Sequence, residues 1–66
     1  MQKEYLSNKT YKGKSIVEAL KEINVDSSFE NRKRLAEING IYEYMGKSEQ
    51  NIRLLNLLVN GKLIKG

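Results

Sequence analysis

Four tyrosines are the side chains of this sequence best suited to hold a sugar, because each combines an apolar ring face with a polar hydroxyl. They are Tyr5, Tyr11, Tyr42 and Tyr44. The structural alternative is a half-buried strand that packs its rings into the core. A core of this size cannot easily absorb four such rings, so we expect at least one tyrosine to contact a ligand.

The densest cluster of positive charge is Arg32-Lys33-Arg34, which could contact phosphate groups through charge and counterion release. The alternative is a solvated helix face, since acidic residues lie nearby in the sequence. Three consecutive residues span about 200° of a helix with about 3.6 residues per turn. They cannot all face one ligand, and we therefore favour the solvated face while keeping Arg32 as a candidate binding residue.

Catalytic chemistry has little support in this composition, because the chain contains no His and no Cys. Structural zinc sites and most acid–base or nucleophilic mechanisms use one of these residue types. A pair of carboxylates is the one catalytic arrangement that remains, and the candidates are Asp26, Glu30, Glu43 and Glu49. None stands in an evident pocket, and we predict no enzyme activity, no metal ligand and no cofactor.

Composition and charge indicate one small basic domain. The 66 residues include 12 Lys and Arg against 8 Asp and Glu, which gives a net charge of +4 and favours an anionic partner. The longest apolar run, Leu57-Leu58-Val59, is far below the ~20 residues that cross a bilayer. No apolar run follows Lys3 to act as a signal peptide. We expect a single domain over residues 1–66 with an ordered core over about 5–65, and no membrane partner.

Three helices are predicted from capping signals and from the spacing of apolar residues. Two pairs have the spacing of a capping box, Ser15 with Glu18 and Ser27 with Glu30, and Ser48 opens the third helix. Apolar residues, Ile52 among them, surround most of the third helix, which should therefore be the centre of the core. Asn24 is a plausible stop for the first helix, and Gly40 and Gly61 fit the left-handed position past the ends of the other two. The first two helices are expected over about 15–24 and 28–39.

Three short strands are predicted from β-branched and aromatic residues and from alternation. The segments are 5–12, read as a hairpin, 41–44, and an edge strand over 62–65. In the second of these, alternation places Tyr42 and Tyr44 on the same side of the sheet. The predicted fold class is α+β, with three short helices packed on a small, mainly antiparallel three-stranded sheet.

Several segments, taken in order, carry a resemblance to one known module. They are 15–20, 26–29 with Arg32, 39–41, 44–46, 50–51, and 54–58 with 61–65. With these segments the chain resembles the C-terminal cell-wall-binding domain of clostridial phage endolysins and related bacterial autolysins. The likeness covers about residues 5–65, and the Asp-Ser-Ser-Phe segment combined with the Gln-Asn and Leu-Leu segments is its most specific part.

The resemblance implies a non-catalytic module that targets a peptidoglycan hydrolase to the Gram-positive, clostridial cell wall for bacterial lysis. The implied partners are wall carbohydrate or a teichoic-acid-like polymer, and an N-terminal amidase or muramidase domain in the full-length protein. It also implies synthesis in the cytoplasm of an infected bacterium without a signal peptide, followed by action at the wall. Met1 lies at the expected domain edge, which fits either a cloned fragment or an internal translation start.

The sequence departs from the family pattern at Asn24, where glycine is common, and at Met45-Gly46-Lys47, where a small hydroxyl residue often flanks the glycine. Lys47 adds a positive charge at the start of the third helix, whose first N–H groups favour anions. We therefore predict a phosphate near Lys47, Ser48 and Gln50. The full set of candidate binding residues is Tyr11, Arg32, Tyr42, Tyr44, Lys47, Gln50 and Asn51.

Each of these assignments has an alternative. Gln50 and Asn51 could instead cap the third helix, and Arg32 could hold Asp26 or the Ser27-Ser28 turn. The first two helices resemble a helix-turn-helix in length, so a small DNA-binding regulator is the alternative function, although the apolar spacing fits that motif poorly. We also expect self-association as a homodimer, unless the third helix is covered within the monomer.

Overall fold

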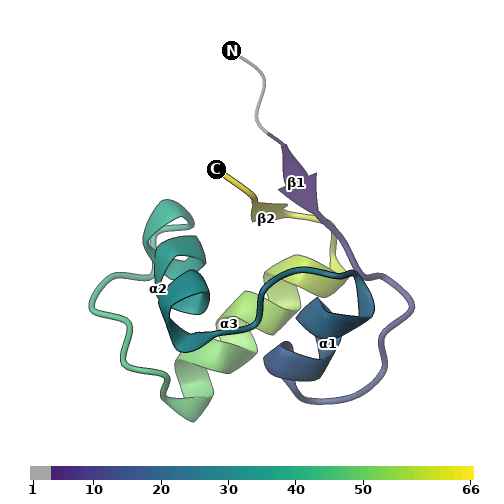
Figure 1. Ribbon diagram of the computed structural model, residues 1–66, viewed down its shortest axis with the longest axis horizontal. Helices are drawn as coiled ribbons and strands as arrows, with labels where there is room; N and C mark the ends of the chain where they lie inside the picture. The colour runs from purple at the N-terminus through teal and green to yellow at the C-terminus, as the bar shows by residue number, and fades with distance from the viewer. Residues whose placement is uncertain (1–3) are drawn as a thin grey trace.

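The computed structural model describes residues 4–66, which form three helices and a two-stranded antiparallel sheet (Figure 1). The expectations for Met1 and Lys3 lie outside the described residues. The elements in chain order are β1 Tyr5–Leu6, α1 Ile16–Glu22, α2 Phe29–Ile38, α3 Ser48–Val59 and β2 Leu63–Ile64. In Figure 1, α3 runs between α1 and α2, and the small sheet lies near both ends of the chain.

The helix starts follow the predicted capping signals, with one difference. Ser15 caps α1, because its Oγ accepts a hydrogen bond from the N–H of Glu18 at 3.2 Å. The N-cap of α2 is Ser28, whose Oγ accepts from the N–H of Asn31 at 3.3 Å. The predicted cap, Ser27, lies one residue earlier, so that expectation was wrong by one position. The third helix begins at Ser48 as predicted.

All three helices end as the sequence predicts, with the chain entering the left-handed region. The φ angles are +60° at Asn24, +82° at Gly40 and +69° at Gly61. After α2, the N–H of Ile41 donates to the carbonyl of Ala36 at 2.7 Å, which satisfies one of the carbonyls left open at a helix end. Asn39-Gly40 is therefore a helix cap and not a hairpin turn.

One hydrophobic cluster joins all three helices to β2. Its largest fully buried side chains are Leu20, Leu35, Leu54, Leu58 and Leu63. Because α3 contributes two of these five and lies between the other helices, it is the centre of the core, as the sequence predicts. Among residues 4–66, no helix has the length and apolar character needed to cross a membrane.

The prediction of a three-stranded sheet was wrong, because residues 41–44 form no strand. Glu43 has a φ of +56°, which breaks the extended backbone and its alternation. Tyr44 is therefore buried at 3% exposure while Tyr42 is 71% exposed, so the two rings do not share a face as predicted.

A side chain occupies the edge of β2 where a third strand would have paired. In the ladder between β1 and β2, Tyr5 lies opposite Ile64, and the N–H of Lys65 donates to the carbonyl of Glu4. Since backbone groups alternate in direction along a strand, those of Ile64 face the other edge. There the Asn39 amide donates from Nδ2 to the Ile64 carbonyl at 3.0 Å, and its Oδ1 accepts from the Ile64 N–H at 2.8 Å.

The predicted N-terminal hairpin over 5–12 was also wrong. Only β1 is extended, and it pairs with β2 instead of with residues 10–12. The chain turns inward at Asn8, which is 6% exposed and whose N–H donates to the Leu58 carbonyl at 3.0 Å. Its side-chain Nδ2 donates to the Ala19 carbonyl and to Glu22 Oε1, each at 3.0 Å. One asparagine thus satisfies carbonyls near the ends of both α1 and α3.

Candidate functional site

Three of the predicted binding residues, Arg32, Tyr44 and Asn51, meet between α2, the 41–47 loop and α3. The Arg32 Nη1 atom donates to the Tyr44 hydroxyl at 3.0 Å and lies 3.5 Å from Asn51 Oδ1. The Tyr44 hydroxyl donates to the same Asn51 oxygen. Arg32 Nε donates to the Ser27 carbonyl at 3.1 Å, which is the structural alternative considered for this residue. These contacts give all three side chains a structural role.

Aromatic packing closes this cluster on the side of α2. The rings of Phe29 and Tyr44 are 5.5 Å apart between centroids, and the Arg32 guanidinium lies 5.9 Å from the Phe29 ring centre. Gly46 has a φ of +73°, and a Cβ placed there would lie 3.2 Å from the Phe29 ring. Glycine is required at this position both for its backbone conformation and for the close approach of the ring.

Gln50 lies in the first turn of α3 and fixes the 41–47 loop. Its Oε1 accepts from the N–H of Met45 at 2.8 Å and from the N–H of Lys47 at 3.2 Å. Its Nε2 donates at 3.2 Å to the carbonyl of Glu43, the residue of the loop that has a positive φ. The side chain therefore replaces the backbone partners that a strand would have supplied to these groups.

Replacing Gln50 with Ala should lower the free energy of unfolding by about 1–2 kcal/mol, because three hydrogen bonds to the loop are lost in a partly exposed setting. Urea denaturation followed by circular dichroism would measure the change. Glu49→Ala is the matched control on the same turn, and it should change stability by less than about 1 kcal/mol. Equal effects of the two substitutions would contradict the role assigned to Gln50.

The remaining predicted residues lie outside the cluster of Arg32, Tyr44 and Asn51. Tyr11 is half-buried, and its hydroxyl accepts from the N–H of Ser15 at 2.9 Å, just before α1. Tyr42 is exposed and has no hydrogen-bonding partner within residues 4–66. Lys47 is exposed at the N-cap of α3. An ammonium cannot accept a hydrogen bond, and within residues 4–66 no side chain accepts from the N–H groups of the first turn of α3; the Gln50 side chain accepts from the N–H of Lys47 itself.

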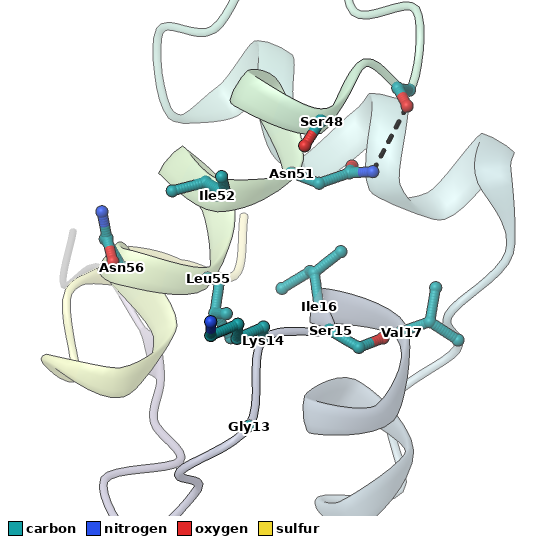
Figure 2. A pocket seen from close by; sticks show the side chains of 11 residues that line it. Gly13, Lys14, Ser15, Ile16, Val17, Ser48, Asn51, Ile52, Leu55 and Asn56 are labelled. Atoms are coloured by element: carbon teal, nitrogen blue, oxygen red, sulfur yellow. Dashed lines mark hydrogen bonds between the residues drawn. The ribbon is translucent and has the colours of Figure 1, made fainter.

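A groove of about 830 Å³ lies between the start of α1 and one face of α3. Figure 2 shows α3 side chains on one wall and the 13–17 segment on the other, with a dashed line from the Asn51 amide to the Gly46 carbonyl. This volume falls in the range of about 300–1,000 Å³ typical of ligand sites. The lining residues are Gly13, Lys14, Ser15, Ile16, Val17, Gly46, Ser48, Asn51, Ile52, Leu55 and Asn56.

Of the candidate binding residues predicted from the sequence, Asn51 lines this groove, and so does Ser48, which was predicted to lie near a phosphate. Ile52 was expected in the core of the third helix, but its side chain is 49% exposed and borders the groove. The sequence contained a signal for this exposure, because Ser48, Ile52 and Asn56 are four residues apart and share one face of the helix. A polar residue on each side of an isoleucine is unlike the leucine pattern of the buried face.

The candidate carboxylates do not assemble into a catalytic pair at the groove. None of Asp26, Glu30, Glu43 and Glu49 lines it, and Asp26 Oδ1 accepts from the Ser28 N–H at 2.9 Å in the turn before α2. Over residues 4–66, no three acidic, His or Cys side chains lie together as a set of metal ligands.

The three residues of the basic cluster point in different directions, as their spacing on a helix predicts. Arg32 points to Tyr44, whereas the Arg34 Nη1 atom donates to the Lys65 carbonyl at 3.2 Å, and Lys33 is exposed. The two helices proposed as a helix-turn-helix lie on opposite sides of α3 in Figure 1. A helix-turn-helix requires its two helices to pack on each other, so this pair does not have that geometry.

Comparisons with protein-family models, with curated proteins and with solved structures found no match to this chain. The resemblance to wall-binding domains therefore rests on the sequence segments that carry it. Three of these segments, 26–29 with Arg32, 44–46 and 50–51, meet in the cluster around Tyr44. Several of the residues on which the resemblance rests thus also make the contacts that fix the 41–47 loop before α3.

Proposed function

We propose that this chain is a non-catalytic module that binds a polymer of the Gram-positive, clostridial cell wall and targets a peptidoglycan hydrolase to it. The observation that carries the proposal is the open groove between α1 and α3, whose lining has one cationic residue and no anionic one. A wall polymer that bears phosphate or other acidic groups is complementary to this lining and to a net charge of +4.

The start of α3 supports the same choice of ligand. Within residues 4–66, no side chain accepts from the N–H groups of the first turn of α3, and Lys47 lies at the N-cap with its side chain exposed. Backbone N–H groups and an ammonium together favour a phosphate oxygen. Gly46 and Ser48, on either side of Lys47, both line the groove, so a phosphate held here would lie at its edge.

The contacts of the 41–47 loop support a binding role by making the surface rigid. Gln50 and Asn51 hold the loop from α3, and Arg32 holds it from α2. A surface that is ordered before binding loses less conformational entropy when the ligand arrives. This scaffold is suited to presenting a fixed groove to a repeating polymer, where several modules on one polymer would add avidity.

Co-sedimentation with purified clostridial cell walls tests the proposed function. We expect the chain to be retained on walls in the presence of excess duplex DNA, and to be released after chemical removal of phosphate-linked polymers. Retention that survives this removal would assign the ligand to peptidoglycan instead. Failure to sediment with walls, together with binding to DNA, would reject the proposal in favour of a nucleic-acid-binding protein.

Reversing the charge at the start of α3 should weaken wall binding. For Lys47→Glu we expect about a tenfold loss at low salt, because a carboxylate would face the phosphate at an uncapped helix start. The loss should shrink as ionic strength rises. Lys33→Glu is the control, since it makes the same charge change at an exposed position on α2. Wall binding by Lys47→Glu equal to that of the control at low and moderate salt would contradict a phosphate at this position.

A further inference from the structure

Three side chains form one ridge along the groove-facing side of α3. Ser48, Ile52 and Asn56 are spaced by four residues, so they lie above one another on the helix about one turn apart. All three line the groove, and Figure 2 shows them on α3, opposite Ser15 and Ile16. The ridge therefore presents a hydroxyl, an aliphatic side chain and an amide in order along one wall.

The polar side chains at the two ends of this ridge, those of Ser48 and Asn56, make no hydrogen bond within residues 4–66. In the part of the chain that the structure describes, Lys14 makes no hydrogen bond and no ion pair. Asn51, by contrast, uses its amide nitrogen on Gly46 and its oxygen on Tyr44 and Arg32. The groove therefore contains one committed amide and three polar groups that remain available to a ligand.

We propose that this groove is the sugar-binding site of the chain, with a saccharide ring over Ile52. Its hydroxyl or amide groups contact Ser48 and Asn56, and an acidic substituent contacts Lys14. This inference rests on the proposed function and makes it more specific, because it names the contact residues and the saccharide as the part of the polymer that is recognised. It also moves sugar contact away from the tyrosines, which the sequence favoured.

The chemistry of the groove fits a saccharide because a pyranose ring has aliphatic C–H faces bordered by polar groups. Ile52 is 49% exposed and supplies the apolar surface, and the buried side chains of Leu55 on α3 and Ile16 on α1 also line the groove. A small number of polar groups around an apolar base is the usual arrangement of a site that fixes ligand orientation. Lys14 and the absence of anionic lining complement an acidic substituent.

The tyrosines are less suited to this role in the structure. Tyr44 is 3% exposed and its hydroxyl is engaged by Arg32 and Asn51. The Tyr11 hydroxyl is engaged by the N–H of Ser15. Tyr42 is exposed but does not line the groove. A sugar ring stacked on Tyr42 would therefore bind outside the groove.

The test is an NMR titration of the ¹⁵N-labelled chain with the polysaccharide released from purified clostridial walls by muramidase digestion. We expect the largest shifts at the amides of Lys14, Ser15, Ser48, Ile52 and Asn56. Repeating the titration with dephosphorylated polysaccharide distinguishes the two parts of the ligand, because shifts at Ile52 and Asn56 should persist while those at Lys14 should diminish. Shifts confined to residues 42–45 or to α2 would overturn the assignment of the groove as the sugar-binding site.

Substitutions test the same assignment on intact walls. Ile52→Asp should weaken wall binding by about tenfold or more, because it removes the apolar contact and adds a negative charge to the groove. Met45→Asp is the matched control, since it places the same charge on a side chain that is 68% exposed and outside the groove lining. Ser48→Ala with Asn56→Ala should weaken binding by about fivefold without adding charge.

The outcomes separate this inference from the function on which it rests. If the unchanged chain does not bind walls, the proposed function fails. If it binds and both Ile52→Asp and the double alanine variant bind equally well, the function stands and the groove is wrong. A concentration-dependent loss of dimer on Ile52→Asp, with wall binding unchanged, would assign the groove to a second copy of this chain and overturn its role in sugar binding.

Discussion

Replacing Asn8 with Asp is expected to lower the free energy of unfolding by about 3–5 kcal/mol, because an acceptor replaces a buried donor and introduces a charge. The Asn8 side chain is 6% exposed, and its Nδ2 donates to the Ala19 carbonyl and to Glu22 Oε1. A carboxylate there would face two oxygen acceptors, one of them charged. A domain of this length has roughly 3–10 kcal/mol of stability in total, so we expect a large decrease in the urea concentration at the midpoint of unfolding, followed by circular dichroism at 25 °C.

The contact with Glu22 provides a way to check the cause. Glu22→Gln alone should change stability by about 1 kcal/mol or less, because Glu22 is exposed and a Gln oxygen can still accept from Asn8. Combined with Asn8→Asp, it should recover about 1–2 kcal/mol, since the Gln amide can donate to the new carboxylate. Purely additive effects in this double-mutant cycle would show that repulsion from Glu22 is not part of the loss.

The local features of this fold were predictable from the sequence, because they depend on residues close together in the chain. Ser15 caps α1, Gly40 and Gly61 end α2 and α3 in the left-handed region, and Ser48 begins α3. Each of these depends on a hydrogen bond or a backbone angle within a few residues. The single error at a helix start, Ser27 for Ser28, is a shift between two adjacent serines that can both cap.

The sheet was not predictable in the same way, because distant side chains complete it. Asn8 and Asn39 look like turn residues in the sequence, beside Lys9 and Gly40. In the structure they satisfy backbone groups 11 and 25 residues away. The strand predicted at 41–44 has suitable residue types, but its place on β2 is taken by the Asn39 amide. No local pattern distinguishes such an asparagine from one that only caps its own helix.

The candidate site shows the same division. Residue type identified Arg32, Tyr44 and Asn51 as a polar and aromatic set, and the structure brings the three together. Their hydrogen bonds are directed at one another and at the loop backbone, and this arrangement depends on the packing of α2 against the loop. Ile52 was assigned to the core because apolar residues surround α3, yet the volume between α3 and α1 leaves it half-exposed. The spacing of apolar residues in the sequence predicts which of them share a face of a helix, but it does not predict which other element covers that face.

The repeated Asn-Gly caps allow the long-range role of Asn39 to be separated from its local one. Asn39 and Asn60 both donate from Nδ2 to the backbone carbonyl four residues earlier, at 2.7 Å in each case. Asn39 alone also bonds both backbone groups of Ile64. Asn39→Asp should therefore lower the free energy of unfolding by about 3 kcal/mol, because the new carboxylate cannot donate to the Leu35 and Ile64 carbonyls and would face both.

Asn60→Asp is the matched control for this prediction, since it makes the same change at an exposed helix end where, within residues 4–66, the asparagine side chain bonds only to its own helix. It should lower stability by about 1 kcal/mol or less, which covers the lost cap and an unfavourable charge near the helix C-terminus. Urea denaturation of both variants gives the comparison, and amide hydrogen exchange at Ile64 should be accelerated only by Asn39→Asp. Equal losses in the two variants would show that the amide of Asn39 serves only its own helix. In that case β2 would be held in place by its pairing with β1 and by the core contact of Leu63. The third strand would then be absent only because Glu43 bends the chain.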